Sequence, residues 1–187
     1  MSESDLARRA HLPDALRVLL EQYPRALWQG HGNFDGLTRF WLERHLMFRR
    51  ALAQWQAETR GFLDNDRAPR AHAQATARLG GFLINELHGH HHIEDTHYFP
   101  VLSAAETRLA RGFDLLDADH HALERELAAL TDRANAHLHA LQQAGDTART
   151  AGAMLAQLDS FAPFLNRHLV DEEDLVVPVI LHHALRF

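Results

Sequence analysis

The 187-residue sequence contains no cysteine and no lysine. Without cysteine the chain can form no disulfide, no thiolate metal site and no cysteine nucleophile. Any transition-metal site must therefore use imidazole and carboxylate ligands, which suit iron, manganese or zinc. All 19 basic residues are arginine, the formal charge is −6, and no basic patch stands out, so we expect no nucleic-acid partner.

Long apolar runs, glycine and proline are also scarce. No apolar run approaches the roughly 20 residues of a membrane-spanning helix, so no membrane partner is expected. The first residues, MSESDLARRAHLPDAL, lack the apolar core of a secretory signal, which predicts a cytoplasmic location. With 10 glycines, 6 prolines and 46% hydrophobic residues, the composition is that of a folded globular protein, and the length fits a single domain.

Apolar residues recur at helical spacing through most of the chain, and no stretch alternates as a half-buried strand does. We therefore predict an all-α fold, with an antiparallel up-down four-helix bundle over residues 34–187. An extra N-terminal helix and turn, residues 1–33, would cover one end of the bundle or pack against a second chain, so the oligomeric state stays open. Pro163 and Pro178 should kink or divide the last helix, because proline lacks a backbone N–H. The predicted helices are Pro13–Trp28, Phe34–Phe62, Arg70–Tyr98, Ser103–Gln143 and Thr147–Leu185.

The chain holds 16 histidines, and several fall inside the apolar stripes of the predicted helices. Residues four apart lie on one face of a helix, so a His-x3-Glu pair directs two ligands into the same space. An exposed ion pair has the same spacing, but carboxylates inside an apolar stripe are costly unless they are paired or coordinated. The apolar setting therefore favours metal binding over a merely structural polar core. The three pairs are His90/Glu94, His120/Glu124 and His168/Glu172.

The two halves of the chain repeat one pattern. A lone histidine is followed by a His-x3-Glu pair, a second acid directly after it, and a proline ten residues after the histidine of the pair. The lone histidines are 75 residues apart, and the pairs are 78 residues apart. Four bundled helices bring these groups together, which is enough for two metal ions with carboxylate bridges. The predicted ligands are His45, His90, Glu94, His120, His168 and Glu172.

This arrangement resembles the hemerythrin family, specifically the hemerythrin-like HHE cation-binding domains, over residues 34–180. The matching residues are His45, His90–Glu94 with the ending Tyr98-Phe99-Pro100, His120, and His168–Glu172 with Val177-Pro178. The resemblance implies two iron ions in a non-haem site, bridged by the two glutamates and an oxo or hydroxo group. It also implies that His45 and His90 share one iron, and that His120 and His168 share the other. Zinc or manganese would suit the same ligands.

One position departs from the pattern of the oxygen-carrying hemerythrins. They place a second histidine four residues after the ligand of the third bundle helix and use His-x4-Asp in the fourth helix, whereas this chain has Glu124 and His-x3-Glu. Glu124 either coordinates, hydrogen-bonds a ligand or faces solvent. One imidazole fewer favours a protein that binds or senses O2, NO or peroxide over a simple oxygen store. The alternatives are a di-iron enzyme acting on peroxide or NO, or a protein that donates iron or repairs iron centres.

The other histidines are expected to lie outside the metal centre. His120 is preferred over its neighbour His121, because it shares the register of the apolar stripe. His97 falls on the Glu94 stripe and is expected near the pocket or packed at the bundle end, and His31 could cover a bundle end. The remaining histidines are expected in contact with solvent: His11, His72, His91, His92, His137, His139, His182 and His183.

Overall fold

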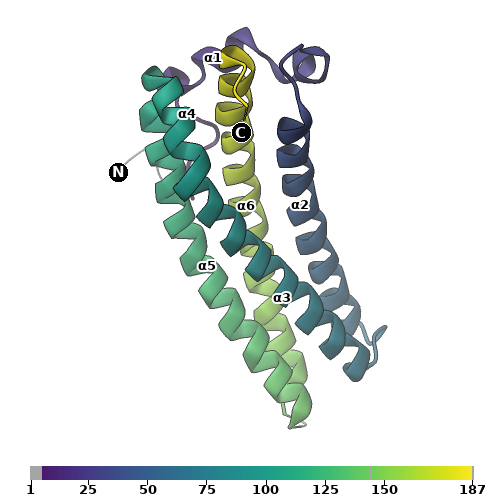
Figure 1. The fold of residues 1–187 in the computed structure, drawn as a ribbon. Coiled ribbons are helices and arrows are strands. Elements are labelled where there is room, and N and C mark those ends of the chain that lie inside the picture. Colours follow the sequence, from purple (N-terminus) through teal and green to yellow (C-terminus); the bar gives the residue numbers. More distant parts are fainter. Residues whose placement is uncertain (1–5, 144, 187) are drawn as a thin grey trace. The chain divides into compact units, whose positions relative to one another are not determined.

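The structure, a computed structural model, describes residues 6–143 and 145–186. Over these residues the chain is all-helical and holds no strand, which confirms the predicted class for this part of the chain (Figure 1). Among the described helices, none combines the length and apolar character that crossing a bilayer requires. The α-helices are α1 (Val18–Gln22), α2 (Gly36–Leu63), α3 (Pro69–Ile93), α4 (Phe99–Ala105), α5 (Ala110–Gln142) and α6 (Thr147–His183).

The chain divides into two compact units, each with its own apolar core. Unit 1 comprises Met1–Leu46, His91–Ala122 and Phe164–Phe187, and unit 2 comprises Met47–His90 and Leu123–Pro163. The helices α2, α3, α5 and α6 each contribute residues to both units. Each unit is therefore assembled from helical segments that are far apart in the sequence, as in a helical bundle.

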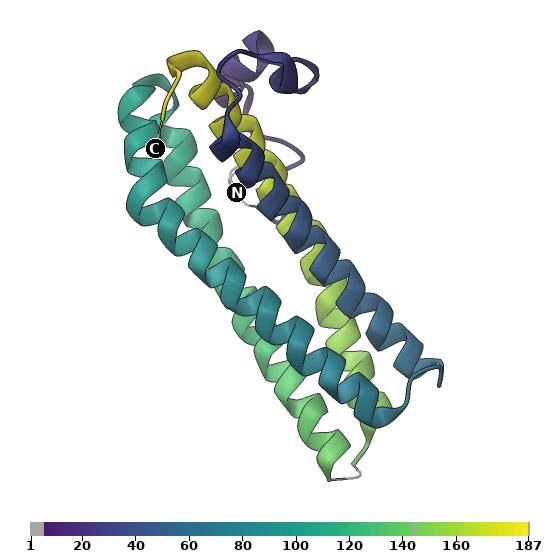
Figure 2. The ribbon, with the colours of Figure 1, turned by 45° about the vertical axis from the view of Figure 1, so that its right-hand side comes forward.

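In unit 2 the core is formed by apolar residues at the predicted helical spacing. Trp55, Phe48 and Phe161 are fully buried, together with leucines of α3 and α5. The helices pack closely at Gly80, where an added Cβ would lie 2.7 Å from the ring of Trp55. In Figure 2 the unit 2 segments of α2 and α3 meet at the loop of residues 64–68 that joins them.

In unit 1 the N-terminal segment packs on the core. Its buried leucines, Leu12, Leu16 and Leu19, join a cluster with Trp41 and with apolar residues of α4, α5 and α6. The single helix predicted over Pro13–Trp28 is wrong: a 3-10 helix (Asp14–Leu16), α1 and a second 3-10 helix (Arg25–Gly30) replace it. Pro24 explains the break, because proline lacks an N–H and disfavours helical backbone at the residue before it.

The helices α2 and α6 begin and end within two residues of the predicted bounds, whereas α5 begins at Ala110 and not at Ser103. Asp35 caps α2, since its Oδ1 accepts the backbone N–H of Thr38 at 3.0 Å. The helix α6 is not divided at Pro163 or Pro178, so that part of the prediction is wrong. A proline costs a helix about 3 kcal/mol, and the burial of residues 175–181 on the core of unit 1 offsets that cost at Pro178.

The helix predicted to end at Tyr98 instead continues through a π-helical turn. The turn spans Glu94–Tyr98 and leads directly into α4, whose first turn contains Pro100. A π turn holds an extra residue, so the side chains beyond it face different directions than in a regular α-helix. As a result Phe99 is buried while His97 is exposed, and the predicted position of His97 near the pocket or packed at the bundle end is wrong. Such turns are frequent at functional sites.

Candidate metal centre

Five of the six predicted ligands lie together in unit 1. They come from α2, the π-helical turn, α5 and α6, and each is at most 2% exposed. These side chains are polar, yet each lies in an apolar stripe, so helical register carries them into the core of the unit. They are His45, Glu94, His120, His168 and Glu172.

Three of these residues form a cluster with two carboxylates. A ring nitrogen of His45 and one carboxylate oxygen each from Glu94 and Glu172 lie within 4.8 Å of one another. The indole N–H of Trp41 donates to Oε1 of Glu172, and Nε2 of His45 lies 3.3 Å from the same oxygen. Burial, together with the neighbouring Glu172 carboxylate, raises the pKa of Glu94 well above its usual range. Two buried carboxylates at this spacing repel each other when ionised, and a cation between them would remove that cost.

A second cluster consists of three imidazoles. His91, His120 and His168 each place a ring nitrogen within 4.8 Å of the others. His91 stacks on His120 with ring centroids 4.1 Å apart. Nε2 of His168 lies 3.4 Å from Oε2 of Glu172, and Nε2 of His120 lies 3.6 Å from Oε2 of Glu94. Within the described residues, neither nitrogen makes a contact with hydrogen-bond geometry. Buried ring nitrogens in this state are rare in a folded protein and fit the role of metal ligands.

His91 is a residue that the sequence interpretation missed. It was expected to be solvated, which is wrong, because it is only 3% exposed. Successive residues of a helix are about 100° apart, and the end of α3 faces the core of unit 1 over an arc wide enough to bury His91. The run His90-His91-His92 just before Glu94 was the available signal.

Glu124, the position where an oxygen carrier has a histidine, lies in unit 2. Its Oε2 is 2.7 Å from Nδ1 of His88, and both side chains are more than a third exposed. This exposed pair answers the question left open by the sequence, since Glu124 faces solvent. His91, which lies in the imidazole cluster, is one buried histidine more than the sequence predicted for the centre.

The sixth predicted ligand, His90, belongs to the unit 2 part of α3. It is 9% exposed, and its ring packs against Phe48 with centroids 5.1 Å apart. It precedes Glu94 by four residues, so helical register places both side chains on the same face of this helix.

Carboxylates outside the two clusters face the Nδ1 atoms of three ligand histidines. Nδ1 of His120 lies 2.7 Å from Oδ1 of Asp95, and Nδ1 of His45 lies 3.0 Å from Oε1 of Glu173. Asp95 and Glu173 are the second acids of the two sequence repeats, and each reaches the lone histidine of the other repeat. A carboxylate can only accept here, so Nδ1 carries the proton and Nε2 is left to bind a metal.

The third such contact is longer, with Nδ1 of His168 lying 3.5 Å from Oδ2 of Asp119. Burial alone would lower the pKa of His168, but Asp119 and Glu172 raise it to about 9. The pKa of His45 is raised as well, because two glutamates outweigh its burial. For His120, burial dominates and lowers the pKa. The neighbouring carboxylates therefore favour a positive charge on His45 and His168, but not on His120.

Most other histidines lie where the sequence placed them. His121 is exposed while His120 is buried, and the five histidines at positions 11, 92, 139, 182 and 183 are exposed. His31 lies edge-on to Tyr23, 5.4 Å away. The surface prediction is wrong for His72 and His137, which form a buried pair in unit 2 with Nε2 atoms 3.0 Å apart. Helical register was the available signal, because Leu79 lies seven residues after His72 and Leu130 lies seven residues before His137, and both leucines are buried.

Comparison with known proteins agrees with this geometry. The model of the hemerythrin HHE cation binding domain matches residues 36–180. No curated protein and no solved structure matches the chain. The matched range contains every predicted ligand and His91, and the histidine and glutamate clusters fit a cation site. The chain belongs to the hemerythrin HHE cation-binding domain family.

Proposed function

We propose that this chain is a non-haem di-iron protein that binds or senses a small ligand such as O2, NO or peroxide. The observation that carries the proposal is the pair of buried ligand clusters in unit 1, one with two carboxylates and one with three imidazoles. The family supports cation binding, and the identity and number of the ions are part of our proposal. The up-and-down order of the four long helices belongs to the same proposal.

In this assignment the two metal positions have different ligands. His45 would hold the first ion, together with His90 as the family resemblance implies, and the imidazole cluster of His91, His120 and His168 would hold the second. Glu94 and Glu172 would supply carboxylate oxygens to the centre. A mixed set of imidazoles and carboxylates without thiolate suits iron, and zinc or manganese would be accepted by the same donors.

The count of donors favours ligand binding. Five imidazoles and two carboxylates would fill most, but not all, coordination positions of two ions, and a small molecule could take what remains. Bound iron would supply that open position and a change of oxidation state. The protein supplies the rest: carboxylates fix the imidazoles through Nδ1, Trp41 holds Glu172, and the fully buried side chains exclude water.

Glu124 in place of a histidine does not argue against an oxygen carrier. The sequence left one place without a histidine, and His91 supplies a ring at the second cluster. The proposal therefore rests on binding or sensing, with O2 included among the ligands. Turnover of peroxide or NO by the loaded protein would identify an enzyme instead.

The test compares two neighbouring histidines of α3. Metal-free protein is loaded with Fe²⁺ without oxygen, its iron is counted, and visible spectra are recorded after adding O2, NO or peroxide. We expect about two irons per chain and new absorption bands for the wild type and for the exposed control His92→Ala. His91→Ala should retain about one iron and lose the ligand bands. Absence of spectral change with all three ligands in the wild type would contradict the proposal.

A further inference from the structure

Two arginines of the N-terminal segment contact carboxylates of the candidate metal centre. Arg9 and Arg25 both precede residue 36, where the match to the family model begins. Both belong to unit 1, as do all their partners described below. These contacts are therefore a feature of this chain's own N-terminal segment.

Arg9 lies between two buried aspartates. Its Nη2 is 2.5 Å from Oδ2 of Asp119, and its Nε donates to Oδ2 of Asp171 at 2.7 Å. The side chain is 1% exposed. The same Oδ2 of Asp119 faces Nδ1 of His168 at 3.5 Å. Arg9 and His168, an imidazole of the second cluster, therefore contact the same carboxylate oxygen.

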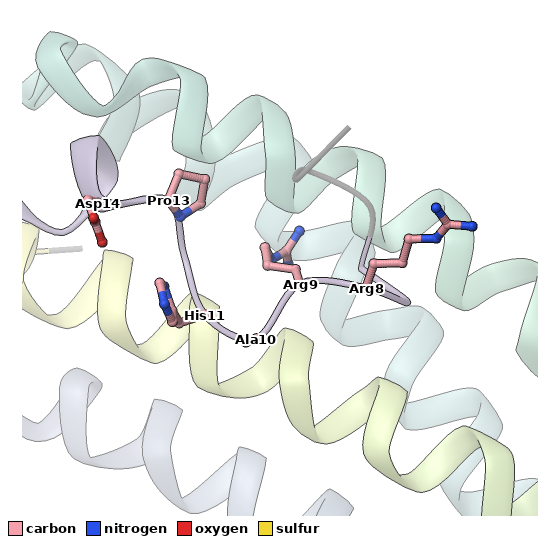
Figure 3. A pocket seen from close by; sticks show the side chains of 6 residues that line it. All are labelled: Arg8, Arg9, Ala10, His11, Pro13 and Asp14. Atoms are coloured by element: carbon pink, nitrogen blue, oxygen red, sulfur yellow. The ribbon is translucent and has the colours of Figure 1, made fainter. Parts of the chain in front are cut away.

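The backbone around Arg9 is fixed as well. Turn residues precede Arg9 and bend residues follow it, and the carbonyl of Ala10 accepts a hydrogen bond at 2.5 Å from Arg167 of α6. Figure 3 shows this stretch, which also lines a pocket together with Arg8, His11, Pro13 and Asp14. Arg167 in turn binds Asp171 at 2.5 Å, so the two arginines balance the charges of the two aspartates.

Arg25 repeats this arrangement at the other cluster. Its Nη1 donates to Oε2 of Glu173 at 2.7 Å, while Oε1 of Glu173 faces Nδ1 of His45 at 3.0 Å. Its Nε donates to Asp174 at 2.7 Å. The side chain is 44% exposed, so solvent screens its charge more than that of Arg9.

We propose that Arg9 and Arg25 tune the metal centre by holding the carboxylates that face Nδ1 of His168 and His45. A carboxylate on Nδ1 pushes electron density toward Nε2 and makes the imidazole a stronger donor to a metal. An arginine on the same carboxylate draws part of its charge away and weakens that effect. The proposal rests on the proposed iron centre. It makes the two arginines positioning residues that act through Asp119 and Glu173.

The experiment is a redox titration of the iron-loaded, full-length protein followed by visible absorption. Arg9→Gln and Arg25→Gln should both shift the iron to a lower reduction potential, because the freed carboxylates make the imidazoles stronger donors to ferric iron. The shift should be larger for Arg9, which is buried. Arg186→Gln is the matched control for Arg25, because Arg186 is 59% exposed and binds a carboxylate, Asp35, at 2.8 Å. Asp35 is not one of the carboxylates that face a ligand histidine. It should leave the potential unchanged.

A double variant separates this route from a general effect of charge. Arg9→Gln should shift the potential much less in an Asp119→Asn background, because the carboxylate it acts through is gone. An equal shift in both backgrounds, or wild-type potentials in Arg9→Gln and Arg25→Gln, overturns the inference while the iron centre stands. A wild type that takes up no iron overturns both. Arg25→Gln keeps the test decisive if Arg9→Gln fails to fold, because its side chain is half-exposed.

Discussion

The buried histidine pair in unit 2 makes the protein sensitive to acid in a way that can be measured. Nε2 of His72 lies 3.0 Å from Nε2 of His137, and both residues are fully buried. One N–H is shared between two nitrogens, so at least one ring must be neutral. Phe62 stacks on His72 at 4.4 Å, and Thr150 contacts Nδ1 of His137 at 2.9 Å, which leaves little room to separate the rings.

The magnitude follows from the pKa of His137. Burial, and then the charge of His72, lowers this pKa to about 4 from 6.5. The pKa of His72 is lowered too, by burial, against the opposing charge of Glu58. Between pH 6.5 and 4 the unfolded chain therefore binds more protons than the folded one, and stability falls as pH falls through this window. At about 1.4 kcal/mol per unit of pKa, His137 contributes roughly 2–3 kcal/mol between pH 7 and pH 4.5.

The assay is urea unfolding at pH 7 and pH 4.5, followed by circular dichroism, with a chelator present so that metal release plays no part. We expect wild type to lose roughly 2–3 kcal/mol more than His137→Leu between the two pH values. His139→Leu, an exposed control two residues further along α5, should keep the wild-type dependence. The same loss in wild type and His137→Leu would refute the reasoning.

Three further predictions follow from the packing of single residues. Glu94→Gln should stabilise the metal-free protein by roughly 1–2 kcal/mol, since it removes a buried carboxylate, and should abolish thermal stabilisation by iron; a less stable metal-free variant would contradict this. His120→Ala should lower the bound iron measured by elemental analysis, and the exposed control His121→Ala should not. Iron loss in His121→Ala with none in His120→Ala would show that His121 is the ligand. Gly80→Ala should destabilise the protein by roughly 1–3 kcal/mol in urea unfolding, because the added Cβ meets the indole ring of Trp55. The control Gly81→Ala, whose Cβ meets nothing within 4 Å, should not destabilise it, and equal effects would contradict this packing.

Local sequence signals were sufficient for the class of fold, for the four longer helices and for the burial of most candidate ligands. The spacing of apolar residues is set by the helical repeat, so it placed His45, His120 and His168 on core faces before any tertiary contact was known. The internal repeat marked Glu94 and Glu172 in the same way. The break at Pro24 was also visible in the sequence, because a proline inside a helical pattern ends or kinks the helix.

Features that depend on tertiary packing were not predictable in this way. A π turn has no distinct residue pattern, so the exposure of His97 could not be foreseen. The burial of His91 depends on how wide an arc of α3 the core covers. The partners of Arg9 and Arg25 lie more than 100 residues away along the chain, and periodicity within one helix carries no information about such contacts.

The most direct test of the account is the metal content of the full-length protein, purified from iron-replete cells without chelators and measured by elemental analysis. The account predicts about two irons per chain, and about one in a variant that lacks His91. Protein that carries no transition metal, and takes up none when Fe²⁺ is supplied without oxygen, would contradict it.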